Sequence, residues 1–104
     1  MSTLNTNVNQ RIDDIKLKTI TFGTTTIPTT GWVANVGDNA LKLNLVIIGV
    51  LSTHWVDISI NKDYQDIASD AEINPTVDEY AGGITIYANR APSVAIPIKY
   101  KVVK

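Results

Sequence analysis

The sequence predicts an all-β fold, an antiparallel β-sandwich of about seven or eight strands with little or no helix. Three observations support this class. Apolar side chains occupy every second position near the C-terminus, in Val94, Ile96, Ile98, Tyr100 and Val102. β-branched residues are common throughout the chain, and clusters of Gly, Pro and Asn recur at short intervals. The length of 104 residues corresponds to a single domain.

Residues 1–13 are expected to form a mobile N-terminal segment that precedes one sandwich domain at 14–104. The first ten residues are rich in Asn and Thr, whose side chains hydrogen-bond to nearby backbone and offer little surface to bury. A short amphipathic helix that packs against a partner is the alternative, because apolar residues occur at helical spacing in Leu4, Val8, Ile12 and Ile15. The Asn and Thr content argues against this helix.

The first strand is expected to begin near Asp14. Ile15 and Leu17 share one parity, whereas Ile20 and Phe22 share the other. The strand therefore contains a bulge near residues 18–19 or is covered on both faces. Residues 23–31, rich in Thr, Gly and Pro, then predict a long connection or an irregular edge strand.

A turn at residues 37–39 and a long strand at residues 40–50 are expected next. The turn is predicted by Gly-Asp-Asn, since each of these residues tolerates a tight backbone. The strand alternates apolar and polar side chains until Val46 and Ile48 make both of its faces apolar. Such a strand is central in a sandwich or is covered by a neighbouring subunit. Val46 and Ile48 are therefore the candidate oligomer interface.

The rest of the chain predicts three strands and one irregular excursion. Residues 54–61 predict a strand with Val56, Ile58 and Ile60 facing inward. Residues 62–77 lack strand periodicity and predict an excursion between sheets that could hold one helical turn. Two strands joined by a turn are expected from Gly82 to the last residue, with Lys99 and Lys101 on the outer face of the final strand.

The sequence carries no recognisable catalytic, cofactor or metal signature. There are no cysteines, and His54 is the single histidine, so a thiolate nucleophile and a His-rich metal site are both excluded. A Ser-His-Asp triad would have to use His54 with Ser52 and Asp57, yet no serine lies in a Gly-x-Ser-x-Gly motif. Acidic residues between Asp63 and Glu72 leave calcium binding open, although they lack the order of an EF-hand loop. We therefore expect a protein that is not an enzyme.

Charge and hydropathy argue against nucleic-acid binding and against insertion into a membrane. The formal net charge is -1, whereas phosphate backbones are bound by clustered Lys and Arg. The N-terminus lacks the basic and apolar regions of a signal peptide, and the most apolar run, residues 45–51, is too short to cross a bilayer. The protein is expected to be made in the host cytoplasm, with association with a virion as an alternative.

Exposed aromatic side chains are the candidate binding surface. Trp55 and Tyr87 fall on the parity opposite to the aliphatic face of their strands. Exposed aromatic rings on a sheet are typical of saccharide or protein contact surfaces. The alternative is that these aromatic side chains fill a second face of the sheet or a corner of the sandwich and have no binding role.

The chain resembles small β-sandwich proteins of phages that infect Gram-positive bacteria. The resemblance lies in Gly31-Trp32, Trp55-Val56-Asp57, the Gly82–Ala88 segment, and Pro92 with Ile96-Pro97-Ile98, and it extends over roughly residues 19–104. Such proteins occur as terminal modules of tail fibres and as proteins of the lytic cassette, of the XepA and YomS type. The resemblance implies a C2-like antiparallel sandwich and a pentameric disc, and it transfers no functional residue.

The expected function is that of a non-enzymatic phage or prophage accessory or structural protein that forms a homo-oligomeric ring, a pentamer or alternatively a trimer. One alternative is a tail-fibre or baseplate head that binds host cell-wall saccharide. Another is a lysis accessory that acts at the membrane. No cofactor and no nucleic-acid partner are expected.

Overall fold

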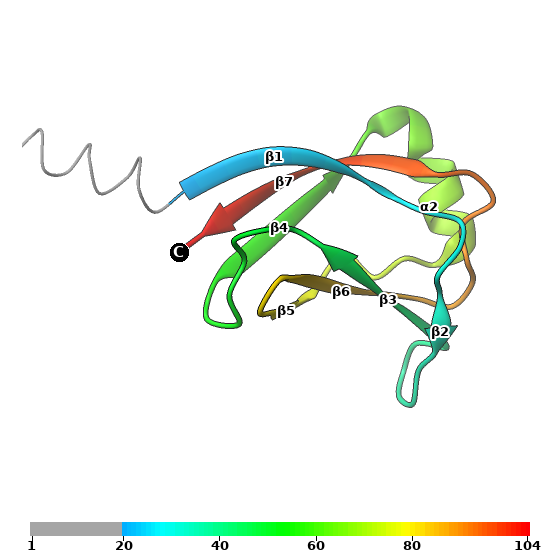
Figure 1. Ribbon diagram of the computed structural model, residues 1–104. Coiled ribbons are helices and arrows are strands. Elements are labelled where there is room, and N and C mark those ends of the chain that lie inside the picture. Colours follow the sequence, from blue (N-terminus) through cyan, green and yellow to red (C-terminus); the bar gives the residue numbers. More distant parts are fainter. Residues whose placement is uncertain (1–19) are drawn as a thin grey trace, which may run out of the picture.

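The computed structural model describes residues 20–104, which form two antiparallel sheets packed face to face (Figure 1). The three-stranded sheet has the order β1-β7-β4, from β1 (Ile20–Ile27), β7 (Ile96–Val103) and β4 (Trp55–Ile60). The four-stranded sheet has the order β2-β3-β6-β5, from β2 (Val33–Ala34), β3 (Leu41–Val46), β6 (Gly83–Ala88) and β5 (Asp78–Tyr80). The predicted all-β class is confirmed. The expected mobile segment at 1–13 and the bulge near 18–19 lie outside the described residues.

The core lies between the two sheets and is filled by the inward side chains of both. β6 contributes Ile84 and Ile86, and β7 contributes Ile96, Ile98 and Val102, all at most 4% exposed. The alternation predicted for the C-terminal strand is therefore correct from Ile96 onward. Val94 precedes β7 and is 49% exposed, because the chain at that point is still crossing between the sheets.

The last two strands, which the sequence predicted to be joined by a turn, lie in different sheets. β6 pairs with β3 and β5, whereas β7 pairs with β1 and β4. The intervening residues 89–95 carry the chain from one sheet to the other. Of the two alternatives for residues 23–31, the edge strand is correct for Gly23–Ile27, although they are a regular part of β1, and the connection to β2 begins at Pro28.

Gly23 is tolerated within β1 because an aromatic ring occupies the space above it. Tyr100 lies directly opposite Gly23 in the register of β1 and β7. A Cβ at position 23 would overlap the Tyr100 ring, which covers the site that a side chain would otherwise fill. The glycine that suggested a break in the strand is thus accommodated by tertiary packing.

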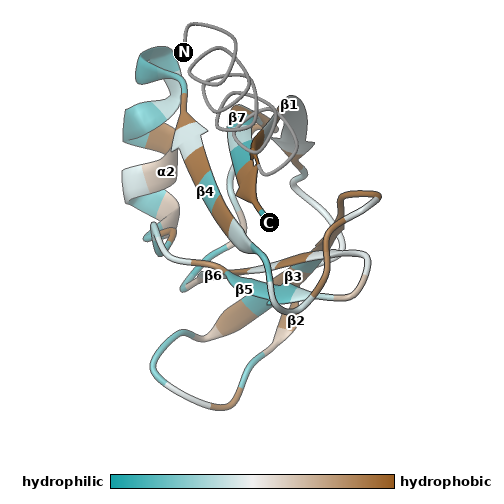
Figure 2. Cartoon of the chain, turned by 90° about the vertical axis from the view of Figure 1, so that its left-hand side faces the viewer, coloured by the Kyte–Doolittle hydropathy of each residue, from teal (hydrophilic) through white to brown (hydrophobic). Residues whose placement is uncertain are grey.

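The excursion between β4 and β5 contains more helix than the single turn expected from sequence. A 3₁₀ turn, η1 (Lys62–Tyr64), leads into α2 (Gln65–Ala71), and both lie beside β4 (Figure 2). Ala68 and Ala71 are the buried residues of α2, and Ala68 belongs to the core. Ile67 of α2 also packs against the core, so α2 covers one side of the sandwich with two alanines and one isoleucine.

Candidate interaction surfaces

One end of the sandwich presents large apolar side chains to solvent. The loop at residues 47–54, the start of β1 and the end of β7 lie together at this end (Figure 1). Figure 2 views the molecule from the same end and shows hydrophobic colouring along the loop that follows β3. The exposed fractions are 96% for Ile48, 74% for Phe22, 73% for Trp55, 69% for Val46 and 51% for Leu51. Val46 faces outward from the four-stranded sheet, whereas Phe22 and Trp55 face outward from the three-stranded sheet, so the five residues surround this end of the sandwich rather than share one sheet face. We call them together the apolar end surface.

The backbone of the loop holds its apolar residues alternately inward and outward. The Ile47 N–H donates to the Gly82 carbonyl at 2.9 Å, and the Gly82 N–H donates to the Val50 carbonyl at 2.8 Å. These bonds keep Ile47 and Val50 in the core at 5% and 2% exposure. Ile48 lies between them and points outward. The strand expected at residues 40–50 therefore ends at Val46, and the second apolar face that the sequence predicted there is uncovered in the single chain.

Phe22 and Trp55 lie on the outer face of the three-stranded sheet. The register aligns Trp55 with Val103 and Val103 with Ile20, and the next outward row contains Asp57, Lys101 and Phe22. Directly opposite residues of paired strands face the same side, so the two aromatic rings share this face with Ile20 and Val103. Lys101 Nζ lies 3.7 Å from Asp57 Oδ2 between the aromatic residues.

Tyr87 lies on the opposite side of the molecule, on the outer face of the four-stranded sheet. Its hydroxyl donates a hydrogen bond of 2.5 Å to Asp78 Oδ2 on β5. This bond, with smaller effects of burial and of the Asp78 charge, raises the pKa of the Tyr87 hydroxyl above its ordinary value. The structure therefore places the two predicted binding residues, Trp55 and Tyr87, on different outer faces, so one copy does not combine them in one surface.

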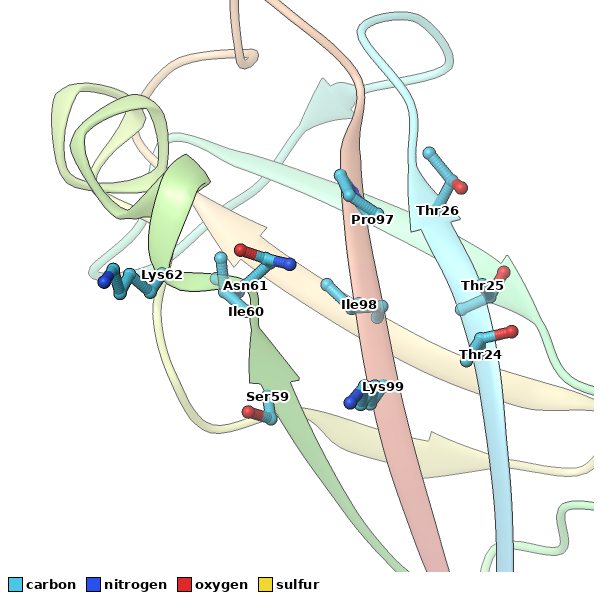
Figure 3. Close-up of a pocket in the computed structure, with 10 residues that line it drawn as sticks. All are labelled: Thr24, Thr25, Thr26, Ser59, Ile60, Asn61, Lys62, Pro97, Ile98 and Lys99. Carbon is cyan, nitrogen blue, oxygen red and sulfur yellow. The ribbon is translucent and has the colours of Figure 1, made fainter.

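A shallow hollow of about 680 Å³ lies on the outer face of the three-stranded sheet, beyond the rows that hold Phe22 and Trp55 (Figure 3). Hydroxyl, amide and ammonium groups line it, with no carboxylate, from Thr24, Thr26, Ser59, Asn61 and Lys99, while Lys62 lies at its margin and extends away from β7. Among the described residues neither lysine forms an ion pair. The hollow was not predicted from sequence, because it depends on β1, β7 and β4 lying side by side.

The triad considered for His54 is not formed. His54 Nδ1 accepts the Leu51 backbone N–H at 3.0 Å, which fixes the loop that carries Ile48 and Leu51. Asp57 pairs with Lys101, and no hydrogen bond joins Ser52, His54 and Asp57 in the part of the chain that the structure describes. A nucleophile, a base and an orienting carboxylate would need such bonds. His54 has a structural role in this loop.

Glu72, the last residue of the acidic segment that left calcium binding open, has a role in local structure. Glu72 ends α2 in a left-handed conformation with φ of 53°, a position at which glycine is usual. Its carboxylate accepts from Asn89 Nδ2 at 2.6 Å and from Arg90 Nη2 at 3.0 Å, which lowers the pKa of Glu72. Within residues 20–104 no group of three or more His, Cys, Asp or Glu side chains is arranged to hold a metal ion.

Comparison with protein-family models, with curated proteins and with solved structures gave no match for this chain. In residues 20–104 no helix is long and apolar enough to cross a membrane.

Proposed function

We propose that this chain is a non-enzymatic structural or accessory protein of phage or prophage origin that assembles into a closed homo-oligomer through its apolar end surface. The phage origin rests on the sequence resemblance described above, which favours a pentameric ring, with a trimer as the alternative. The observation that supports assembly is Ile48, which is 96% exposed although the loop around it is fixed by backbone hydrogen bonds.

The composition of the apolar end surface favours a protein partner over simple solvent exposure. Single exposed apolar residues are normal on any surface, whereas several large ones at one end of a small domain are typical of contact surfaces. Trp and Phe are enriched at the energetic centres of interfaces, because they bury a large area at low cost in side-chain entropy. A ring would cover this surface by repeating one contact between neighbouring copies until it closes.

Light scattering on the unmodified protein tests assembly, and the mass should be a multiple of the 11.3 kDa chain. Ile48→Lys should give folded monomers, because the contact would then bury an unpaired ammonium group. Val36→Lys is the matched control, since Val36 is fully exposed but lies in the hairpin at the other end of the sandwich. A monomeric unmodified protein would overturn the proposal, and so would equal masses for the two variants and the parent.

A second candidate function is supported by the hollow over β7, namely a head module that binds cell-wall saccharide. Hydroxyl and amide groups can hydrogen-bond to a glycan, and Lys99 and Lys62, which form no ion pair within residues 20–104, would favour an anionic one, Lys99 within the hollow and Lys62 at its margin. Sedimentation with purified cell walls tests this function, and a Lys62→Gln and Lys99→Gln double variant should bind less. If the protein sediments with liposomes and not with cell walls, the result would favour a lysis accessory that acts at the membrane.

A further inference from the structure

The edges of the two sheets differ sharply in how they are protected. An edge strand presents unpaired N–H and C=O groups, and natural proteins shorten, cap or charge such edges to prevent pairing with another chain. In the four-stranded sheet the edge strands β2 and β5 have two and three residues. In the three-stranded sheet the edge strands β4 and β1 have six and eight residues.

The open side of β4 is capped by side chains. The Val56 N–H donates to Glu79 Oε1 at 2.9 Å, and the Ile60 carbonyl accepts from Gln65 Nε2 at 2.9 Å. These two caps lie near the two ends of the strand, and η1 follows directly after it. A strand from another molecule cannot pair along β4 without displacing them.

β1 has none of these protections. Its sequence from Ile20 to Ile27 contains no charged residue and no proline. Among the described residues no side chain hydrogen-bonds to its backbone, and it pairs with β7 alone. Its outward residues Phe22, Thr24 and Thr26 are exposed, Phe22 at 74%. β1 is therefore the one long open edge in residues 20–104.

We propose that β1 pairs in antiparallel fashion with β1 of a second copy across a two-fold axis, which joins the two three-stranded sheets into one. A second copy fits this edge because its β1 brings no charge against the neutral strand and contributes threonines, which form favourable cross-strand pairs with threonine and aromatic residues. The pairing would also cover part of the exposed Phe22 ring.

The alternation of side chains restricts the register of this pair. Opposite residues must face the same side of the joined sheet, so even-numbered residues of one copy lie opposite even-numbered residues of the other. A nearly full overlap then places Gly23 or Thr24 on the axis. We assign Thr24, because it places Thr24 opposite Thr24 and Phe22 opposite Thr26, whereas the other register places two glycines opposite one another.

This contact goes beyond the proposed function, because it is two-fold whereas the ring contact joins one copy head-to-tail to the next. Pairing of two strands of this length buries less accessible surface area than the roughly 1,600 Å² of a standard protein–protein interface, so the contact is weak between single chains. In a ring the contacts would act together, and two rings would meet face to face with twice the number of copies.

Disulfide trapping tests the assigned register, since the natural chain has no cysteine. Thr24→Cys should form a covalent dimer under mild oxidation about tenfold faster than Ser59→Cys, because directly opposite Cα atoms lie within the span of a disulfide. Ser59 is the matched control, as it is exposed in the same row of the same sheet but on the capped strand β4. Equal rates for the two variants would overturn the Thr24-centred pair.

Amide hydrogen exchange at two protein concentrations tests the pairing without a change in β1. It is best measured in Ile48→Lys, so that loss of the ring contact and loss of the edge contact are distinguished. Backbone amides of Phe22, Thr24 and Thr26, which face the open edge of β1, should exchange more slowly at the higher concentration, while those of β4 should not change. Exchange in β1 that is independent of concentration would overturn the proposal, whatever the mass of the unmodified protein.

Discussion

Ile96→Asp should destabilise the domain severely, because Ile96 begins the central strand of the three-stranded sheet and is 0% exposed. Its partner across the ladder is Ile27, which is also 0% exposed. Truncation to alanine at such a site costs about 2–5 kcal/mol through lost burial and a residual cavity. A carboxylate adds the cost of desolvating an unpaired charge, so the total reaches a large part of the about 5–15 kcal/mol that holds a typical domain folded.

The buried carboxylate also makes the loss depend on pH. Burial raises the pKa of the new carboxyl in the folded state above its unfolded value, so the protonated form is tolerated better. The penalty is therefore smallest below the unfolded pKa, and it grows by about 1.4 kcal/mol per pH unit until the folded pKa is reached. Ile96→Asp should accordingly be less destabilised near pH 4 than near pH 7, relative to Ile96→Ala at the same pH.

Circular dichroism during thermal and urea unfolding measures both effects at one fixed protein concentration. Lys99→Asp is the control on the same strand, since Lys99 faces solvent and forms no ion pair with a described residue. Its cost should stay within about 0.5 kcal/mol, a shift in Tm of only a few degrees. Equal melting temperatures for Ile96→Asp and Lys99→Asp would refute the assignment of the inward face of β7.

Two further predictions concern positions where backbone or charge is constrained. Gly83→Ala should lower the unfolding free energy far more than Gly23→Ala. A Cβ at position 83 would overlap the backbone carbonyl of Leu45, whereas a Cβ at position 23 would meet the movable Tyr100 ring. Urea unfolding compares the two variants, and a larger loss for Gly23→Ala would contradict the reasoning. Glu72→Gln should destabilise the folded domain at neutral pH but not at acidic pH. The folded pKa of Glu72 is depressed by Asn89 and Arg90, so its contribution is complete above the ordinary pKa of 4.5 and is lost as pH falls through the folded value. Unfolding curves of Glu72→Gln and the parent should therefore converge at low pH, and a constant difference across pH would exclude this linkage.

The sequence by itself determined the all-β class and the inward face of the clearest strands. Period-two alternation identified Ile96, Ile98 and Val102 as core residues, and it located the strand that contains Val56 to within a residue at each end. These features are local, because the alternation of a strand follows from its own pleat whatever its partner. The outward character of Val46 and Ile48 was recognised for the same reason.

The tertiary structure alone decided which strands pair and which surfaces result. The same alternation suits a hairpin or a crossing between sheets, so the placement of β6 and β7 in different sheets could not be predicted from residues 82–104. Gly23 became part of a regular strand only because Tyr100 lies over it. The separation of Trp55 from Tyr87, the hollow over β7 and the open edge of β1 all depend on strand order, which is set by contacts between residues far apart in the chain.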